Sequence, residues 1–465
     1  MLSIRKGRPF SSISRETGDL TQGNAVRVIT AFALPIMLGN LFQQMYSMAD
    51  TAVVGKGVGA AALAAVGAAS PVTQLLLGLL SGMTGGMSVV IAQQFGAGNE
   101  RRTRAAIVNG LYLLVVFTAL VTALGLLCGR ALFHLIQTPE EMMEGACVYA
   151  MILFAGAAAT AAYNYEAGVL RAFGNSVIPL LLLIGTSLLN VGLDLLFVIV
   201  WRGGIAGAAI ATVLSQLVSG VLCFRYMKKR IPLLRLNAGD WRPNPAMLLE
   251  HLRTGMPMAF FSSLLAVSFL LLQSALNALG GVEMAAYTAA SKMDTLVYQI
   301  LGAFGTAVST FAAQNYGKGA LQRVRTGVCK CLILTVGISI MMTGFVFAFG
   351  ERFMQLFIGE DETQILALGQ QYMRVTSVFY WILGLNFVIR FALIGVGKTV
   401  IPLAVGISEI LTRAVVAFVL VDKAGFAGMT LASPACWFTS TLLCALCYRP
   451  MLNNALRKSV QFHTS

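Results

Sequence analysis

The sequence predicts an all-α polytopic membrane protein with twelve transmembrane helices, arranged in two six-helix bundles that are related by a parallel internal repeat. Of its 465 residues, 57% are hydrophobic and 11% are charged, and the mean hydropathy is +0.78, a composition typical of membrane proteins and not of soluble folds. The length leaves room for about a dozen spans of ~20 apolar residues. The net charge of +14 does not indicate nucleic-acid binding, because the basic residues fall in alternate loops.

Twelve apolar stretches are long enough to cross a bilayer. In the first half of the chain they are residues 26–54, 61–93, 103–127, 145–170, 177–200 and 205–225. In the second half they are residues 248–278, 284–314, 325–349, 363–395, 399–421 and 426–447. Interior glycines do not argue against these helices, because small residues let membrane helices approach one another closely.

The charges of the loops predict the orientation of the chain in the membrane. One set of loops holds few basic residues, namely Lys56, Arg130, Arg202, Arg352 and Lys423. The opposite set holds the basic N-terminal tail, Arg101, Arg102 and Arg104, and the cluster Lys228-Lys229-Arg230. We therefore expect both termini to lie in the cytoplasm, in a multi-pass protein of the prokaryotic inner membrane without a cleavable signal peptide.

The two halves of the chain repeat one another. The segment Ala92-Gln93-Gln94-Phe95-Gly96-Ala97-Gly98 matches Ala313-Gln314-Asn315-Tyr316-Gly317-Lys318-Gly319, 221 residues later, and Pro35 corresponds to Pro257. We expect a six-helix lobe with a basic tail over residues 1–235, a cytoplasmic linker over 236–247, and a second lobe with a short cytoplasmic tail over 248–465. Because six is an even number, both halves enter from the same side, with the substrate cavity between them.

A carboxylate at membrane depth is the main indication of function. Asp194 and Asn190 lie one turn apart in the apolar stretch 187–200, so they share one helical face. An intramembrane acid is costly and marks a functional site by default, although neighbouring helices could also satisfy it structurally. Asp50 and Thr212 are predicted at a similar depth near the outer side, so the four residues could meet in the outer half of the first bundle.

Polar residues on the face of the first helix that carries Asp50 predict a wet cavity rather than a lipid-facing surface. They are Gly39, Gln43, Tyr46 and Ser47. Together with Asn164 of the fourth helix, we assign Gln43, Tyr46 and Ser47 to the substrate cavity. Pro35 removes one backbone hydrogen bond and predicts a bend in the same helix.

The second half lacks this acidic chemistry. The counterparts of Asn190 and Asp194 are Arg413 and Ala417, and the seventh helix contains no acid to match Asp50. Because Glu409 and Arg413 are four residues apart on one helix, we expect them to neutralise each other. Lys292 and Asp294 are two residues apart and face different ways, and either could line the cavity or pair with another helix.

These motifs make the chain resemble the multidrug and toxic compound extrusion (MATE) family over roughly residues 24–450. The resemblance rests on Pro35, Met48-Ala49-Asp50-Thr51, Val54-Gly55, the repeated Ala-Gln-x-x-Gly-x-Gly and Asn190-x-x-x-Asp194. Within the family it is similar to the DNA-damage-inducible branch. The resemblance implies a secondary antiporter that exports amphipathic, often cationic compounds in exchange for inward H⁺ or Na⁺. It also implies that Thr212 joins Asp50, Asn190 and Asp194 around the ion.

Two other classes of function fit the sequence less well. A flippase for a lipid-linked precursor would need a strongly cationic central cavity, whereas the intramembrane bases are Lys292, Arg374 and Arg413. A membrane enzyme is disfavoured because His134, His251 and His463 do not cluster with acids. We therefore expect no enzymatic activity and no cofactor, small amphipathic or cationic substrates, the lipid bilayer as the surroundings, no nucleic-acid partner, and a monomer. The pair Cys444 and Cys447 lies in an apolar helix without a second pair, so a zinc site is not indicated.

Overall fold

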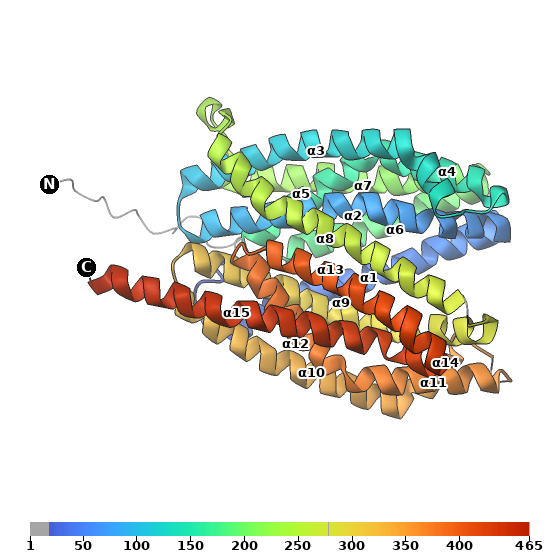
Figure 1. Ribbon diagram of the computed structural model, residues 1–465. Helices are drawn as coiled ribbons and strands as arrows, with labels where there is room; N and C mark the ends of the chain where they lie inside the picture. Colours follow the sequence, from blue (N-terminus) through green and yellow to red (C-terminus); the bar gives the residue numbers. More distant parts are fainter. Residues whose placement is uncertain (1–17, 278, 360, 465) are drawn as a thin grey trace.

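The computed structural model describes residues 18–277, 279–359 and 361–464, and this part of the chain is helical without β-strands (Figure 1). The basic tail over residues 1–17 lies outside the described residues. The first bundle contains α1 (Ala25–Gly57), α2 (Ala60–Gly96), α3 (Glu100–Leu135), α4 (Glu140–Ala155), α5 (Ala157–Ala172), α6 (Val177–Asp194) with the π-helix η1 (Leu195–Val200), and α7 (Gly204–Arg230).

The second bundle follows two short 3-10 helices, η2 (Pro232–Leu234) and η3 (Ala238–Trp241). Its elements are α8 (Pro245–Asn277), α9 (Gly281–Gly317), α10 (Leu321–Gln355), α11 (Thr363–Val378), α12 (Tyr380–Gly395), α13 (Val400–Val415) with the π-helix η4 (Val416–Leu420), α14 (Val421–Thr430) and α15 (Ala432–Thr464). The start of α1 and the end of α15 lie at the same end of the molecule (Figure 1), which we call the termini end.

The internal repeat extends to details of the backbone. The pairs α4/α5 and α11/α12 are each bent by 50° at a short break, and the π-helices η1 and η4 occupy equivalent places. Glycines with positive φ recur in matched pairs, such as Gly98 at 71° with Gly319 at 79°, and Gly204 at 59° with Gly425 at 55°. These turns favour glycine because a Cβ atom disfavours the left-handed region.

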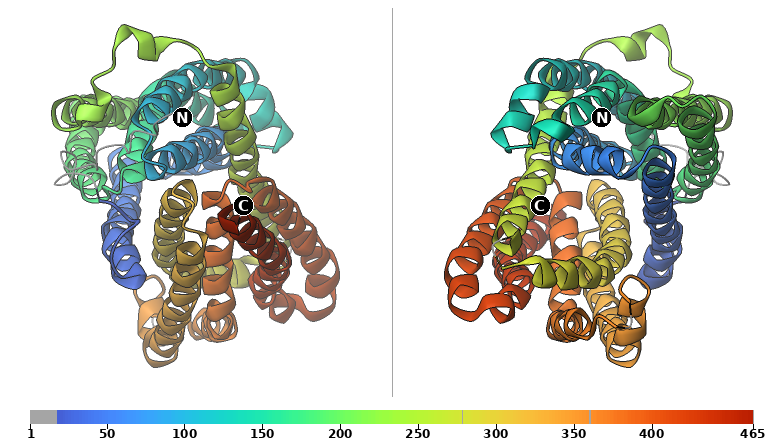
Figure 2. Two further views of the ribbon diagram at one scale, coloured as in Figure 1. Left: turned by 90° about the vertical axis from the view of Figure 1, so that its left-hand side faces the viewer. Right: turned by 90° about the vertical axis from the view of Figure 1, so that its right-hand side faces the viewer.

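The first helix of each bundle crosses to the other bundle at the termini end. Figure 2 shows α1 and α8 on opposite sides of the molecule, each spanning both layers. The first turns of α1 pack through Ile29 and Phe32 against residues of α9 such as Val308 and Phe311. The first half of α8 packs in the same way against α2, for example through Met258. These crossed helices tie the two bundles together.

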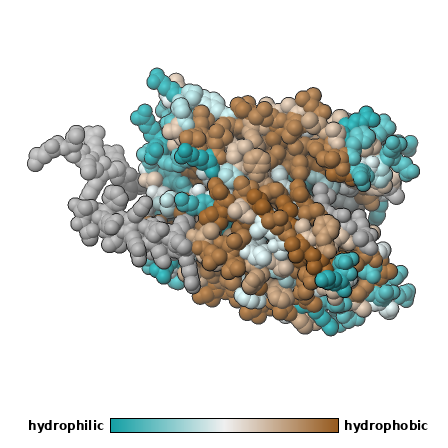
Figure 3. Space-filling view, in the orientation of Figure 1, coloured by the Kyte–Doolittle hydropathy of each residue, from teal (hydrophilic) through white to brown (hydrophobic). Residues whose placement is uncertain are grey.

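The surface fits a protein embedded in a bilayer. Figure 3 shows a broad hydrophobic belt between two hydrophilic ends. Within the described ranges, nine helices are long and apolar enough to span a membrane, or eleven when each bent pair counts as one span. The remaining predicted span corresponds to α15, so the prediction of twelve transmembrane helices is confirmed. The twelfth helix was predicted to begin at 426, whereas α14 covers 426–430 and α15 begins at Ala432, because the chain turns at Leu431.

Candidate functional site

The two acids of the first bundle lie together, although 144 residues of sequence separate Asp50 and Asp194. Asp50 belongs to the last third of α1 and Asp194 ends α6. Their carboxyl groups face each other closely enough for a proton on one to be hydrogen-bonded by the other. Asp194 is 0% exposed and Asn190 is 1% exposed, whereas Asp50 is half-buried with its Oδ1 atom inaccessible to solvent.

The polar atoms of this acid pair lack hydrogen-bond partners within the described part of the protein. No hydrogen-bond partner is present for either carboxylate oxygen of Asp194 or for either polar side-chain atom of Asn190. Asp50 Oδ1 also lacks a partner. Buried polar groups normally have partners, and those that do not often mark a functional site. A proton or a hard cation would satisfy these oxygens, because carboxylate and amide oxygens suit such ions.

Hydroxyl groups complete the surroundings of the acid pair. The hydroxyl of Tyr46 lies within hydrogen-bonding reach of Thr212 and within electrostatic range of both acids. Thr212 itself donates to the carbonyl of Ala208 in the preceding turn of α7, at 3.1 Å. Tyr149 of α4 also lies within electrostatic range of Asp50 and Asp194. Sequence reasoning missed Tyr149, a polar aromatic residue near the start of the predicted span 145–170.

A polar cavity of about 330 Å³ lies inside the first bundle, between the acid pair and the termini end. Its lining includes Pro35, Gln43 and Asn164, and the Asn164 amide lies 3.5 Å from the Ser81 hydroxyl. The structure thus brings Gln43 and Asn164 to one cavity, while Tyr46 belongs with the acids. Ser47 is exposed and is not among the residues that line this cavity.

A larger cavity of about 810 Å³ lies between the two bundles, in the half of the molecule away from the termini end. Its walls come from α1, α2, α8, α9, α12 and α15, and include Asn40, Gln74, Tyr287, Asp294 and Phe387. Among the described residues that line it, Asp294 is the one charged residue. The cavity predicted between the bundles is therefore present, with an amphipathic lining.

At the termini end the bundles are in backbone contact. A Cβ atom on Gly86 of α2 would lie 2.5 Å from Cα of Gly255 in α8, and one on Gly96 would lie 2.0 Å from the carbonyl oxygen of Gln314 in α9. Such distances exclude any side chain. The Gln314 side chain also donates to the carbonyl of Ala172 at 2.8 Å and accepts from the amide of Leu20 at 3.0 Å. These contacts close this end between the bundles.

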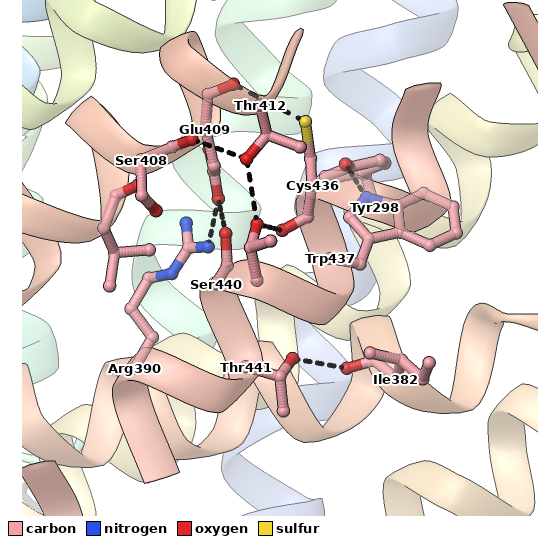
Figure 4. Close-up of polar contacts among 12 residues, drawn as sticks. Tyr298, Ile382, Arg390, Ser408, Glu409, Thr412, Cys436, Trp437, Ser440 and Thr441 are labelled. Atoms are coloured by element: carbon pink, nitrogen blue, oxygen red, sulfur yellow. Dashed lines mark hydrogen bonds and ion pairs between the residues drawn. The ribbon is translucent and has the colours of Figure 1, made fainter. Parts of the chain in front are cut away.

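Glu409 is paired with Arg390 of α12, a partner that we did not predict, while Arg413, the predicted partner, is an electrostatic neighbour of the same acid. The guanidinium of Arg390 donates to Glu409 Oε1 at 2.5 Å, and the Ser440 hydroxyl donates to the same oxygen at 2.8 Å (Figure 4). Helical spacing identifies partners within one helix, whereas α12 and α15 bring other donors closer. Arg413 extends toward Tyr287, Tyr298 and Cys436, with Glu409 a weaker neighbour.

Asp294 both lines the cavity and pairs with other helices. It accepts hydrogen bonds at 2.7 Å from Tyr372 of α11 and at 2.7 Å from Tyr380 of α12. Lys292 is exposed on another face of α9. The two alternatives left open for Asp294 therefore both apply.

Comparisons with known proteins give the family. The MatE family model matches the chain twice, over residues 35–196 and 257–419, once in each bundle. The chain is 29% identical to the "Probable multidrug resistance protein YpnP" of Bacillus subtilis (strain 168) over 375 residues, which cover 80% of this chain and 83% of that protein. It is 26% identical to the "Probable multidrug resistance protein NorM" of Thermotoga maritima over 395 residues, 84% of each chain.

Solved structures confirm the fold. The structure titled "Outward-facing conformation of a multidrug resistance MATE family transporter of the MOP superfamily" superposes with a TM-score of 0.87, covering 94% of this chain and 98% of that chain at 24% identity. The family resemblance seen in the sequence is confirmed, while assignment to the DNA-damage-inducible branch stays a prediction. The chain belongs to the MATE family of multi-pass membrane transporters.

Proposed function

We propose that this protein is a secondary active antiporter that exports amphipathic, often cationic compounds in exchange for inward H⁺ or Na⁺. The observation that carries the proposal is the pair of facing acids, half-buried Asp50 and fully buried Asp194. Both oxygens of Asp194 and Oδ1 of Asp50 have no protein donor among the described residues. Asn190 and Thr212 supply further oxygens from α6 and α7. Because Asp50 belongs to α1 and Asp194 to α6, an ion bound between them would couple the positions of the two helices.

The arrangement of the two bundles supports alternating access. The bundles touch through glycine backbones at the termini end and enclose a cavity toward the opposite end. The distribution of basic loop residues favours a cytoplasmic termini end, and in that orientation this conformation would face outward. Binding of H⁺ or Na⁺ at the acid pair would reshape α1 and reduce the affinity for substrate, since a ligand shifts an equilibrium through its different affinity for each state.

The lining of the cavity favours export of cations over a lipid-linked pyrophosphate. Aromatic rings of Tyr287, Tyr298 and Phe387 and the Asp294 carboxylate face this space, a combination that attracts organic cations. A pyrophosphate would need basic residues, and the described lining of this cavity contains none. A flippase is therefore not supported.

The test is ion-driven efflux in proteoliposomes. Purified protein is reconstituted, a fluorescent cationic dye is loaded, and an inward H⁺ or Na⁺ gradient is imposed. We expect dye to leave faster with one of these gradients than without it, and ionophores that collapse that gradient to remove the difference. Efflux that is indifferent to both gradients would overturn the antiport mechanism.

A further inference from the structure

The cavity inside the first bundle contains a positively charged side chain, Arg171, that the antiport mechanism does not use. Arg171 lies in the last turn of α5 and lines this cavity of about 330 Å³. Around it are the side chains of Gln43, Asn164 and Gln216, together with Ser176. Arg171 is the one charged residue among the described residues that form the lining, so the cavity is polar and positive.

The guanidinium of Arg171 has no ion pair and no hydrogen bond with the described residues. Arg390, a residue of the same type in the second bundle, has Glu409 as its partner. Glu166, five residues before Arg171, lines a separate pocket on the other side of α5. Arg171 is half-buried, and a charge that is partly removed from water without a partner is unfavourable, so this arginine suits an anionic ligand.

Two further features suit an anion at this place. Ser176 precedes the first residue of α6, an 18-residue helix, so the cavity includes the positive end of a helix dipole. Gln216 also lines the cavity, and the NH₂ group of a side-chain amide can donate hydrogen bonds to an anion. The planar fork of arginine matches a carboxylate or a phosphate with two parallel hydrogen bonds.

We propose that the first-bundle cavity binds the carboxylate or phosphate group of an organic anion or zwitterion, with Arg171 as its counter-charge. The face of α1 that carries Pro35, Gly39 and Gln43 continues through Tyr46 to Asp50, so the bundle presents a positive site and an acidic site along one helix. This inference rests on the proposed export function for its physiological meaning, and it extends the substrates beyond simple cations.

A matched pair of dyes tests the proposal by binding alone. Rhodamine 110 carries a free carboxylate, and rhodamine 123 is its methyl ester and therefore a simple cation. Fluorescence polarisation measures the binding of each dye to purified wild-type protein and to Arg171→Gln. We expect the substitution to weaken the binding of rhodamine 110 by about tenfold, the effect of losing a charge-assisted hydrogen bond. The affinity for rhodamine 123 should change by less than about twofold.

Control variants separate this role from a structural one. Arg171→Lys keeps the charge and loses the fork, so it should bind rhodamine 110 with intermediate strength. Removal of an unpaired charge should leave the melting temperature of Arg171→Gln no lower than that of the wild type. Absence of rhodamine 110 binding to the wild type, or equal effects of Arg171→Gln on both dyes, would overturn the anion site. Failure of the antiport mechanism would instead appear as gradient-independent efflux with the dye selectivity intact.

Discussion

Arg390 and Glu409 join α12 to α13 through a hydrogen-bonded ion pair of 2.5 Å, with both side chains 8% exposed. The guanidinium also lies 5.1 Å from the ring centroid of Phe261 in α8. One buried pair thereby holds three helices of the second bundle in contact. Such a pair contributes little when both partners are present, but removal of one leaves a buried charge without compensation.

The first prediction is that Glu409→Gln destabilises the protein. The variant leaves Arg390 charged beside a neutral amide, at a cost of about 3 kcal/mol. Thermal unfolding in detergent should show a clearly lower melting temperature. Adding Arg390→Met to the same variant removes the uncompensated charge and should recover most of the loss. No recovery in the double variant would contradict the role of the ion pair.

The second prediction concerns the glycine contact at the termini end. In Gly86→Ala the new Cβ would lie 2.5 Å from Cα of Gly255, whereas Gly85 has nothing within 4 Å. Backbone atoms cannot move aside as a flexible side chain does, so Gly86→Ala should force α2 and α8 apart and disfavour the closed end. Gly85→Ala is the matched control and should behave as the wild type.

The distance between two spin labels, at positions 101 and 398, distinguishes Gly86→Ala from Gly85→Ala. Arg101 and Lys398 are exposed and belong to different bundles at the termini end. Both positions are changed to cysteine in a variant from which the native cysteines have been removed. We expect a longer mean distance in Gly86→Ala and an unchanged one in Gly85→Ala. Equal distances in both variants would show that the glycine contact does not control closure.

Sequence patterns predicted the structural features that depend only on the order of residues along the chain. Twelve spans followed from apolar length, and the repeat followed from matched segments such as those around Gly98 and Gly319. The sharp 50° bends within the fourth and tenth predicted helices were not predicted, because the apolar stretches run through them without interruption. A helix break that is covered by neighbouring helices leaves little trace in composition.

The sequence did not predict which side chains on different helices would pair with each other. The four-residue spacing of Glu409 and Arg413 predicted a pair within one helix, whereas the ion pair of Glu409 with Arg390 depends on the packing of α12 beside α13. The tyrosine partners of Asp294 were missed for the same reason. Depth estimates placed Asp50 and Asp194 at one level, and the packing of α1 against α6 then brought them face to face.

The third prediction tests the tyrosine partners of Asp294. Tyr372→Phe and Tyr380→Phe each remove one hydrogen bond to a buried carboxylate, so each should cost about 1.5–3 kcal/mol of stability. The double variant should cost more than the two single losses together, because it leaves the acid without either donor. Melting temperatures measure these effects, with Tyr316→Phe on the surface as the control. Additive or negligible losses would show that Asp294 is satisfied in another way.

The last prediction concerns ion coupling at the acid pair. Asp50→Asn and Asp194→Asn preserve shape and hydrogen-bonding capacity but cannot carry a negative charge, so neither should bind the coupling ion. We expect gradient-driven dye efflux from proteoliposomes to fall to the level seen without a gradient in both variants. Because each variant removes one of two facing buried acids, the melting temperature should be unchanged or higher.

Two control variants make this test specific. Glu166→Gln neutralises another partly buried acid of the first bundle, one that lines a pocket with Arg225 and Lys228 away from the acid pair, and it should retain gradient-driven efflux. Glu409→Gln should lose stability yet keep ion dependence in the fraction that stays folded, since its partner lies in the second bundle. Normal coupling in both Asp variants, or a stable Glu409→Gln protein without coupling, would move the ion site away from Asp50 and Asp194. Loss of ion coupling in Asp50→Asn and Asp194→Asn alone would place coupling in the first bundle, the half of the repeat that contains these two acids.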